Sequence, residues 1–306
     1  ILKKKVGYTM KFVLACDIGG TDLKMGKFSL SGDLVESVKI PLANRKGQTI
    51  LTQIESRMDS DVVGLALSIP GFINPNTGFI EMGGAIEDFN GFNIFAYFKE
   101  QFPNLAISAE NDANCVALAE KWKGSAKEET DFLCLTIGTG IGGAIYLNDA
   151  LYRGRRNRSG EFGHMFSEHV TSDIAENHKF NKTATLAVIR EKYATCMNIP
   201  FQNVSGEQIF EAYDQGEEVA SLLVSDLYSG LAMNILNLYY VFAPPTFYIG
   251  GGITSRKTFM NELKQRILEI DPAFCAVIRS TSFGNQSGMI GAVYHHIASR
   301  KTLELI

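Results

Sequence analysis

The sequence lacks several features that would assign it to a broad class of protein. Its five cysteines (positions 16, 115, 134, 196 and 275) are scattered, odd in number and never spaced as CxxC. This favours reduced thiols in a cytosol over a disulfide framework. The net charge of -4 gives no indication of a nucleic acid or an anionic membrane surface as partner. The N-terminus has no apolar segment of the kind that signal peptides carry.

Long uninterrupted apolar runs are also missing. The most apolar window, Leu227 to Pro244, is broken by serine, asparagine and two prolines, which indicates a buried helix and not a membrane span. The chain has 306 residues, 45% of them hydrophobic, which is enough for a large core in one or two domains. We therefore expect a cytoplasmic protein that binds neither nucleic acid nor membrane.

Two glycine-tipped hairpins are the strongest pattern present. The apolar strand Phe12–Cys16 runs into Asp17-Ile18-Gly19-Gly20-Thr21, and an alternating strand follows. The arrangement recurs over Leu133–Leu147, 119 residues further on by comparison of Leu14 with Leu133 (133 − 14). Glycine at a tip permits positive φ and lets backbone N–H groups approach an anion. We expect two βαβ-rich halves that close a cleft, with both hairpins facing a shared ligand.

Each hairpin has a functional and a simpler interpretation. In the first, Asp17 can hold a magnesium ion, directly or through water, and Thr21 can bond a phosphate oxygen; alternatively, the turn binds nothing. In the second, Gly138, Gly140 and Gly143 match GxGxxG, but a strand follows where a dinucleotide fold requires a helix. No GxxxxGK[ST] motif occurs, so a P-loop enzyme is also excluded.

The stretch Ala109–Cys115 places a carboxylate beside two carboxamides, between an apolar run and an expected helix. Asp112 can take a proton from a bound hydroxyl, and Asn111 can hold neighbouring hydroxyls. The alternative is that Asn111, Asp112 or Asn114 caps the helix.

Further glycine-rich segments suggest a pocket. Gly71 and Gly83-Gly84 are candidate pocket walls or simple turn glycines. Gly160-Glu161-Phe162-Gly163-His164 puts a carboxylate and an imidazole three residues apart, where both can bond adjacent sugar hydroxyls. The glycines of Gly250–Ile253, after a strand, suit a flat ligand such as an adenine ring. The four arginines of Arg153–Arg158 form either a solvated loop or an anion site.

Taken together and in this order, the motifs resemble the ROK family of sugar kinases, and most closely its bacterial β-glucoside kinases. The segments that carry the resemblance are DIGGT at 17–21, ENDAN at 110–114, TIGTGIGG at 136–143, GEFGH at 160–164 and GGGI at 250–253. The resemblance implies an α/β fold of the actin-like (ribonuclease-H-like) type, two-lobed with an interdomain cleft. It also implies ATP and Mg²⁺ as cofactors and the 6-hydroxyl of a glucosyl unit as acceptor, with cellobiose as an example.

The resemblance also implies a role for individual residues. Asp112 is the general base. The sugar is bound by Asn111, Glu161, His164, Gly71 and Gly84. The nucleotide and metal are bound by Asp17, Ile18, Gly19, Gly20, Thr21, Lys24, Thr136, Gly138, Thr139, Gly140, Gly251 and Gly252, with Asp17 as the magnesium residue.

One departure from the family concerns zinc. Most members continue from GExGH into CxCGxxGCxE, whereas this chain reads Met165-Phe166-Ser167-Glu168-His169 and has its next cysteine at position 196. Four Cys or His ligands at workable spacing cannot be assembled. We expect no structural zinc, a sugar-binding role for His164, and no counterpart of the motif's final glutamate.

Other functions remain open. Glucokinase or N-acetylmannosamine kinase activity is possible, as is a sugar sensor without catalysis. The family's repressors carry a helix-turn-helix domain before the first hairpin, for which the 16 residues before Asp17 are too few. We expect a tail at 1–9, an N-terminal lobe at 10–116, a C-terminal lobe at 117–286 and a helix at 287–306 that packs on the N-terminal lobe. The resemblance implies a homodimer, and the apolar residues of Val219–Phe242 suggest that it forms through the second lobe.

Overall fold

The computed structural model describes residues 10–170 and 174–303, so the expected tail at 1–9 lies outside the described residues. The described chain forms two compact units. Unit 1 takes its residues from Ile1–Lys127, Gly154–Arg158 and Asn285–Ile306, and unit 2 from Glu128–Arg153 and Ser159–Gly284. The sequence interpretation began the second lobe at residue 117, whereas α3 (Asp112–Trp122) belongs entirely to unit 1.

Unit 1 is built on a five-stranded mixed sheet in the order β3-β2-β1-β4-β8. Its first three strands are antiparallel neighbours, and β4 and β8 run parallel to β1. The strands are β1 (Phe12–Ile18), β2 (Asp22–Ser29), β3 (Leu34–Pro41), β4 (Val62–Ile69) and β8 (Ala106–Asn111). Because β1, β4 and β8 are parallel, their carboxyl ends meet at one edge, where Asp17 pairs with Ser68 and Ile69 pairs with Asn111.

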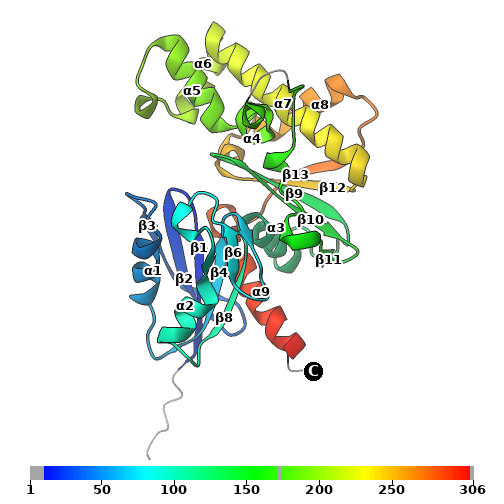
Figure 1. Ribbon diagram of the computed structural model, residues 1–306. Helices are drawn as coiled ribbons and strands as arrows, with labels where there is room; N and C mark the ends of the chain where they lie inside the picture. The colour runs from blue at the N-terminus through cyan, green and yellow to red at the C-terminus, as the bar shows by residue number, and fades with distance from the viewer. Residues whose placement is uncertain (1–9, 171–173, 304–306) are drawn as a thin grey trace, which may run out of the picture. The chain divides into compact units, whose positions relative to one another are not determined.

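Helices cover both faces of this sheet, as the period-2 alternation of its strands requires. Leu14, Cys16 and Ile18 of β1 pack in a core that includes buried residues of α1 (Gly47–Glu55) and α2 (Ile94–Gln101). The intervening residues of β1 face the side where α9 (Ser287–Leu303) packs against β1, β4 and α3 (Figure 1). A smaller sheet, β5-β6-β7, completes unit 1 with β5 (Phe72–Ile73), β6 (Phe79–Met82) and β7 (Phe92–Asn93).

Unit 2 repeats the sheet of unit 1. Its order is β11-β10-β9-β12-β13, with an antiparallel β9–β10 hairpin and with β12 and β13 parallel to β9. The strands are β9 (Phe132–Ile137), β10 (Ile141–Leu147), β11 (Ala150–Leu151), β12 (Thr246–Gly250) and β13 (Val277–Ser280). The internal repeat that the two glycine-tipped hairpins indicated is therefore confirmed, because β1–β2 and β9–β10 occupy equivalent places in equivalent sheets.

The helices of unit 2 surround a long central one. They are α4 (Phe180–Thr183), α5 (Leu186–Met197), α6 (Gly206–Asp214), α7 (Glu218–Phe242) and α8 (Phe259–Ile270). By length and composition α7 could cross a membrane, but Leu227, Leu231 and Ile235 are fully buried in the core of unit 2. This burial agrees with the interpretation of the apolar window as a core helix.

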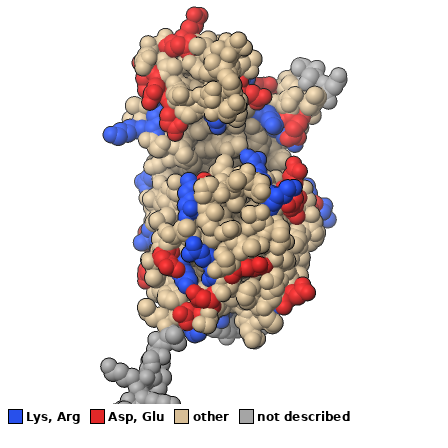
Figure 2. All heavy atoms as spheres, turned by 90° about the vertical axis from the view of Figure 1, so that its left-hand side faces the viewer, with Lys and Arg blue, Asp and Glu red and all other residues tan. Residues whose placement is uncertain are grey.

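On the face that Figure 2 presents, acidic and basic side chains are interspersed. No large area of one sign appears on that face.

Candidate functional site

Asp17 is held at the carboxyl end of β1 by its two neighbouring strands. Ser68 of β4 donates its hydroxyl to Asp17 Oδ1 at 2.8 Å, and Lys24 of β2 donates from Nζ to Asp17 Oδ2 at 3.0 Å. Asp17 is 9% exposed and Ser68 is fully buried, so both donors act where water is scarce. Each carboxylate oxygen keeps a further acceptor position. The residue is therefore fixed in orientation and still able to accept from a hydrated Mg²⁺, which suits the expected metal role.

The glycines of the first hairpin provide space and not unusual backbone angles. Neither Gly19 nor Gly20 has a positive φ, although the sequence interpretation had noted that glycine permits one there. A Cβ on Gly19 would lie 3.1 Å from the carbonyl oxygen of Asp22, and one on Gly20 would lie 3.1 Å from Cβ of Ala85. The turn is thus compact, and a larger residue at either position would press on its neighbours.

Other residues of this turn differ in exposure. Ile18 is fully buried, whereas Thr21 is exposed and donates its hydroxyl to Asp22 Oδ2 at 3.1 Å. Arg45 donates from Nε to the carbonyl oxygen of Gly20 at 2.8 Å. The Thr21 oxygen can still bond a ligand, whereas Ile18 can contribute only backbone groups.

Asn111 begins α3 as its N-cap. Its Oδ1 accepts from the backbone N–H of Asn114 at 3.0 Å, and its Nδ2 donates to the carbonyl oxygen of Gly71 at 3.0 Å. Glu110 is buried and accepts from the backbone N–H of Asn111 and from Nδ2 of Asn114, both at 2.9 Å. The capping role therefore belongs to Asn111. One N–H and one acceptor position of its amide remain available for a hydroxyl.

Asp112 is the first helical residue of α3, and its side chain is half-buried. Its Oδ1 accepts from the backbone N–H of Ala113 at 2.9 Å. Burial and the nearby charge of Asp17 raise the pKa of Asp112 to about 6, because both disfavour a second negative charge there. A carboxylate with a pKa close to neutrality is suited to accept a proton during a reaction.

Gly71 and Gly84 come together although they belong to different loops. Gly71 has φ +88°, and a Cβ there would lie 2.0 Å from the carbonyl oxygen of Met82 and 2.7 Å from the backbone nitrogen of Gly84. Asn111 holds the same glycine through its carbonyl oxygen. The two expected pocket glycines thus form one backbone contact beside the start of α3.

The second hairpin and the triple-glycine turn also meet. Gly138 donates its N–H to the carbonyl oxygen of Gly140 at 2.9 Å across the tip. Gly251 has φ +98°, and a Cβ there would lie 2.0 Å from the carbonyl oxygen of Ile137. Thr136 pairs with Gly250 in the parallel β9–β12 register. The two motifs are therefore adjacent in unit 2. In the sequence they lie 111 residues apart, counted from Gly140 to Gly251 (251 − 140).

The segment Gly160–His164 packs directly on β10. A Cβ on Gly143 would lie 2.1 Å from the Phe162 ring, and one on Gly163 would lie 2.4 Å from the side chain of Asn181. Asn181 accepts from the backbone N–H of Ile141 at 2.6 Å. One amide side chain therefore joins the second hairpin to the segment that carries Glu161 and His164.

Glu161 and His164 lie one turn apart. The backbone N–H of His164 donates to the carbonyl oxygen of Glu161 at 3.0 Å, within a 3-10 turn that includes Phe162–His164. Residues three apart in such a turn share a side, and both side chains are half-buried. That the carboxylate and the imidazole bond adjacent sugar hydroxyls stays a prediction.

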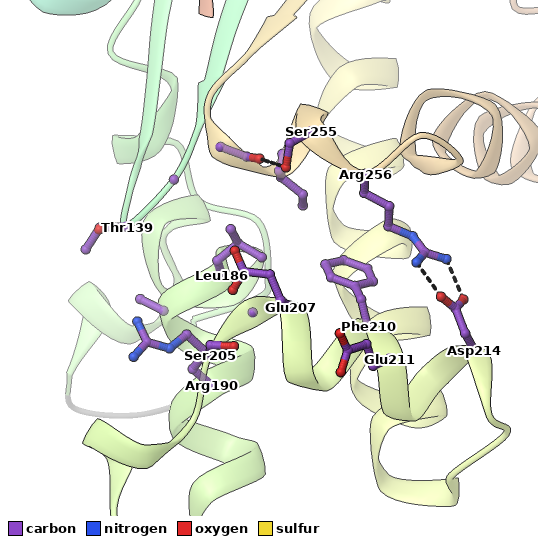
Figure 3. A pocket seen from close by; sticks show the side chains of 15 residues that line it. Thr139, Leu186, Arg190, Ser205, Glu207, Phe210, Glu211, Asp214, Ser255 and Arg256 are labelled. Carbon is purple, nitrogen blue, oxygen red and sulfur yellow. Dashed lines mark hydrogen bonds and ion pairs between the residues drawn. The ribbon is translucent and has the colours of Figure 1, made fainter. Parts of the chain in front are cut away.

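Unit 2 also contains a pocket of about 600 Å³. Figure 3 shows that its walls come from the second hairpin, from the turn after β12 and from α5 and α6. It is lined by Gly138, Thr139, Leu186, Ala187, Arg190, Ser205, Gly206, Glu207, Phe210, Glu211, Asp214, Gly252, Ile253, Ser255 and Arg256. Three of these, Gly138, Thr139 and Gly252, were expected to bind nucleotide.

The candidate residues divide between the two units. Unit 1 contains the general-base candidate, the first hairpin and the glycine pair, which are Asp17, Ile18, Gly19, Gly20, Thr21, Lys24, Gly71, Gly84, Asn111 and Asp112. Unit 2 contains Thr136, Gly138, Thr139, Gly140, Glu161, His164, Gly251 and Gly252. Within each unit the structure brings together segments that lie far apart in the sequence.

In the part of the chain that the structure describes, no three His, Cys, Asp or Glu side chains gather as metal ligands. Beyond His164, Ser167 instead donates its backbone N–H to the carbonyl oxygen of His178 at 2.9 Å, and Asn234 of α7 donates from Nδ2 to Ser167 Oγ at 3.1 Å.

The arginine segment makes ion pairs within unit 1. Arg156 and Arg158 bond the Glu81 carboxylate at 3.1 and 2.6 Å. Two of the four arginines are thus already paired, which favours the loop interpretation over an anion site.

Sequence reasoning missed several residues that position the site. Ser68 is one, because a serine at the end of a buried strand carries no distinctive pattern. Gly288 is another, and it lies against Asp17 although a Gly in a helix usually indicates only packing. Arg256 and Asp214 of the pocket bond each other across 42 residues, a pairing that no local signal reveals.

Comparison with known proteins gives consistent results. The sequence profile of the ROK family matches residues 13–298. The β-glucoside kinase of Listeria monocytogenes is 42% identical over 287 residues, which covers 93% of this chain and 97% of that protein. The β-glucoside kinase of Klebsiella pneumoniae is 41% identical, covering 92% and 95%. A solved Listeria monocytogenes structure, provisionally assigned as an N-acetylmannosamine kinase, superposes with TM-score 0.90 at 42% identity and covers 94% of this chain and 99% of that one.

Proposed function

Since the chain belongs to the ROK family and has its actin-like fold, we propose that it is an ATP-dependent kinase of β-glucosides. In this proposal it transfers a phosphoryl group to the 6-hydroxyl of a glucosyl unit, as in cellobiose. The supporting observation is the carboxylate of Asp112. Its pKa is raised to about 6 by burial and by the nearby charge of Asp17. The enzyme acts in the cytoplasm, where ATP is abundant.

Asp112 orients the attacking hydroxyl and accepts its proton. Phosphoryl transfer passes through a loose transition state, so positioning and charge stabilisation supply most of the catalysis. Asn111 has one amide N–H and one acceptor position left for neighbouring sugar hydroxyls after capping α3. Glu161 and His164 bond further hydroxyls of the sugar, and the Gly71–Gly84 contact shapes the sugar site.

ATP occupies the pocket of unit 2. Its base and ribose lie among α5, α6 and the turn Gly252–Ser255, where both apolar and polar residues line the walls. The phosphates bond the backbone N–H groups of the second hairpin, including Gly138 and Thr139. The first hairpin, with Thr21, offers phosphate-binding groups of the same kind in unit 1.

Asp17 is the residue for magnesium, held directly or through water. Its carboxylate is fixed by Ser68 and Lys24 and retains acceptor positions, so the residues present fit a hydrated Mg²⁺. When bound, the ion neutralises phosphate charge. Lys24, which pairs with Asp17, limits how much negative charge this site carries without metal.

The test is ADP release with cellobiose, an aryl β-glucoside, glucose and N-acetylmannosamine, each at a fixed ATP concentration. We expect the highest kcat/KM for the β-glucosides, with phosphorus at the 6-position of the non-reducing glucose by NMR. A preference for N-acetylmannosamine would instead support the activity provisionally assigned to the solved Listeria protein. If none of these sugars causes ADP release, the proposal is contradicted and a sensor without catalysis is favoured.

A further inference from the structure

One arginine joins two of the walls of the pocket in unit 2. Arg256 directly follows the turn Gly252–Ser255, which forms one wall. Its guanidinium reaches Asp214 at the end of α6, which forms another wall (Figure 3). Nη1 and Nη2 each donate to one Asp214 oxygen at 2.7 Å. A bidentate pair of this kind fixes both the distance and the orientation of the two side chains.

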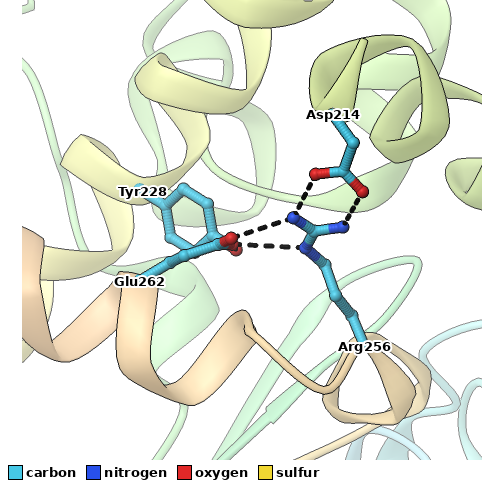
Figure 4. Close-up of polar contacts among 4 residues, drawn as sticks. All are labelled: Asp214, Tyr228, Arg256 and Glu262. Atoms are coloured by element: carbon cyan, nitrogen blue, oxygen red, sulfur yellow. Dashed lines mark hydrogen bonds and ion pairs between the residues drawn. The ribbon is translucent and has the colours of Figure 1, made fainter.

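A second carboxylate anchors the same guanidinium from behind. Arg256 donates to Glu262 of α8 from Nε at 3.2 Å and from Nη2 at 2.9 Å. The hydroxyl of Tyr228, on α7, donates to Glu262 in turn (Figure 4). The arginine is therefore held by α8 and, through Glu262, by α7, and it links these helices to α6.

The arginine also contacts an aromatic ring of the pocket wall. The guanidinium carbon lies 4.9 Å from the centroid of Phe210, a pocket residue. Phe210 and Asp214 are four residues apart on α6, so both project from one side of the helix. Arg256 thus holds α6 through two contacts, one with the Asp214 carboxylate and one with the Phe210 ring.

The charges favour this arrangement, and the Arg256–Asp214 pair within it contributes little to global stability. Asp214 and Glu262 together raise the pKa of Arg256, and Arg256 holds the pKa of Asp214 below its ordinary value. The Asp214 side chain is 54% exposed, and ion pairs of such exposure are weak contributors to folding. Loss of the pair should therefore affect the local pocket more than the fold.

We propose that Arg256 is a positioning residue that sets the width of the nucleotide pocket, an inference that rests on the proposed function. By holding Asp214 and Phe210 at a fixed distance from Gly252–Ser255, it preorganises the site for a purine nucleotide. Arg256 lies outside the groups assigned to the phosphates and the sugar. Its loss should weaken nucleotide binding and leave the chemical step intact.

The main experiment is steady-state kinetics of Arg256→Met. We expect the KM for ATP to rise about tenfold, while kcat and the KM for cellobiose stay within about twofold of wild type. The matched control is Arg266→Met, because Arg266 of α8 also bonds a carboxylate and a second helix, through Glu269 at 3.1 Å and Ser225 at 2.8 Å, but does not line the pocket. An unchanged KM for ATP in Arg256→Met, or an equal rise in Arg266→Met, would overturn the proposal.

A double-mutant cycle separates positioning from direct contact with the nucleotide. If Arg256 acts through Asp214, then Asp214→Asn alone raises the KM for ATP, and the double variant is little worse than Arg256→Met. Additive effects would instead assign Arg256 a direct contact and overturn the positioning role. Asp214→Asn also preserves the test if Arg256→Met fails to fold, since it keeps the size of the side chain.

Calorimetric binding of ADP distinguishes this inference from the proposed function. Wild type should bind ADP, and Arg256→Met should bind it about tenfold more weakly, whatever sugar is phosphorylated. If wild type binds no ADP, both the proposed function and this inference fail. If wild type binds ADP and Arg256→Met binds it equally well, only this inference fails.

Discussion

Gly288, in the first turn of α9, lies so close to Asp17 that a Cβ on it would stand 2.3 Å from Oδ1 of the carboxylate. The same Cβ would stand 2.4 Å from Cγ. The C-terminal helix of unit 1 thus limits the space around the proposed magnesium residue, and only glycine permits the approach.

Gly288→Ala should impair catalysis by displacing Asp17 from Ser68 and Lys24. We expect kcat to fall about 10- to 100-fold, because small displacements of positioned groups have effects of this size, and the dependence on Mg²⁺ concentration should shift upward. Ala292→Gly, on the same helix, is the control, since it weakens α9 without adding an atom near Asp17. Wild-type kcat in Gly288→Ala would show that the Asp17 carboxylate can move without consequence.

The pKa of Asp112 can be measured directly in the metal-free protein. A carboxyl-carbon NMR titration should give a value of about 6, and Asp17→Asn should lower it, because the charge of Asp17 is one of the two causes of the shift. Burial remains in that variant, so the pKa should stay above its ordinary value of 3.8. In turnover the base must be unprotonated, so kcat/KM should decline on the acid side. A pKa that does not respond to Asp17→Asn would refute the coupling.

His296 should make the protein less stable in mild acid. It is 2% exposed, its Nδ1 lies 2.9 Å from Ser108 Oγ, and its Nε2 has no hydrogen-bond partner among the described residues. Burial, with the nearby charges of Arg300 and His295, lowers its pKa from 6.5 to about 4. The pKa of His296 is lower in the folded state than in the unfolded state. Its contribution to the free energy of unfolding is therefore complete above pH 6.5 and is lost as the pH falls towards 4.

Urea unfolding at pH 7.5 and pH 5 tests this sign and size. Between these two pH values the free energy of unfolding should fall by about 2 kcal/mol more in wild type than in His296→Gln, since one pKa unit corresponds to about 1.4 kcal/mol. Equal losses in the two proteins would mean that His296 does not titrate abnormally in the folded state.

The exposed side of α7 provides a test for the expected homodimer. Leu222, Met233, Tyr240 and Val241 are large apolar residues of this helix that remain exposed in the single chain. If a second copy covers them, sedimentation at micromolar concentration should show a dimer, and Val241→Asp should convert it to monomer with little change in melting temperature. A monomeric wild type would count against the dimer.

The sequence predicted the features that short-range patterns determine. The β1–β2 and β9–β10 hairpins follow from alternation around glycines, and the start of α3 follows from the polar stretch around Asn111. It did not predict α5, α6 or β3. Most of β3 is exposed, so its residues lack the apolar alternation of a buried strand. The partners of the site also lie far away in sequence, as Gly288 does from Asp17, so only tertiary structure brings them together.

The most direct measurement of the central claim is the turnover of Asp112→Asn. Asn111, and not Asp112, caps α3, so the substitution removes the base without removing the cap. We expect kcat with cellobiose to fall by about 10²- to 10⁴-fold, while the Kd values for cellobiose and ADP and the melting temperature stay near wild type. A folded Asp112→Asn variant that retains more than about a tenth of wild-type kcat would contradict the assignment of Asp112 as the general base.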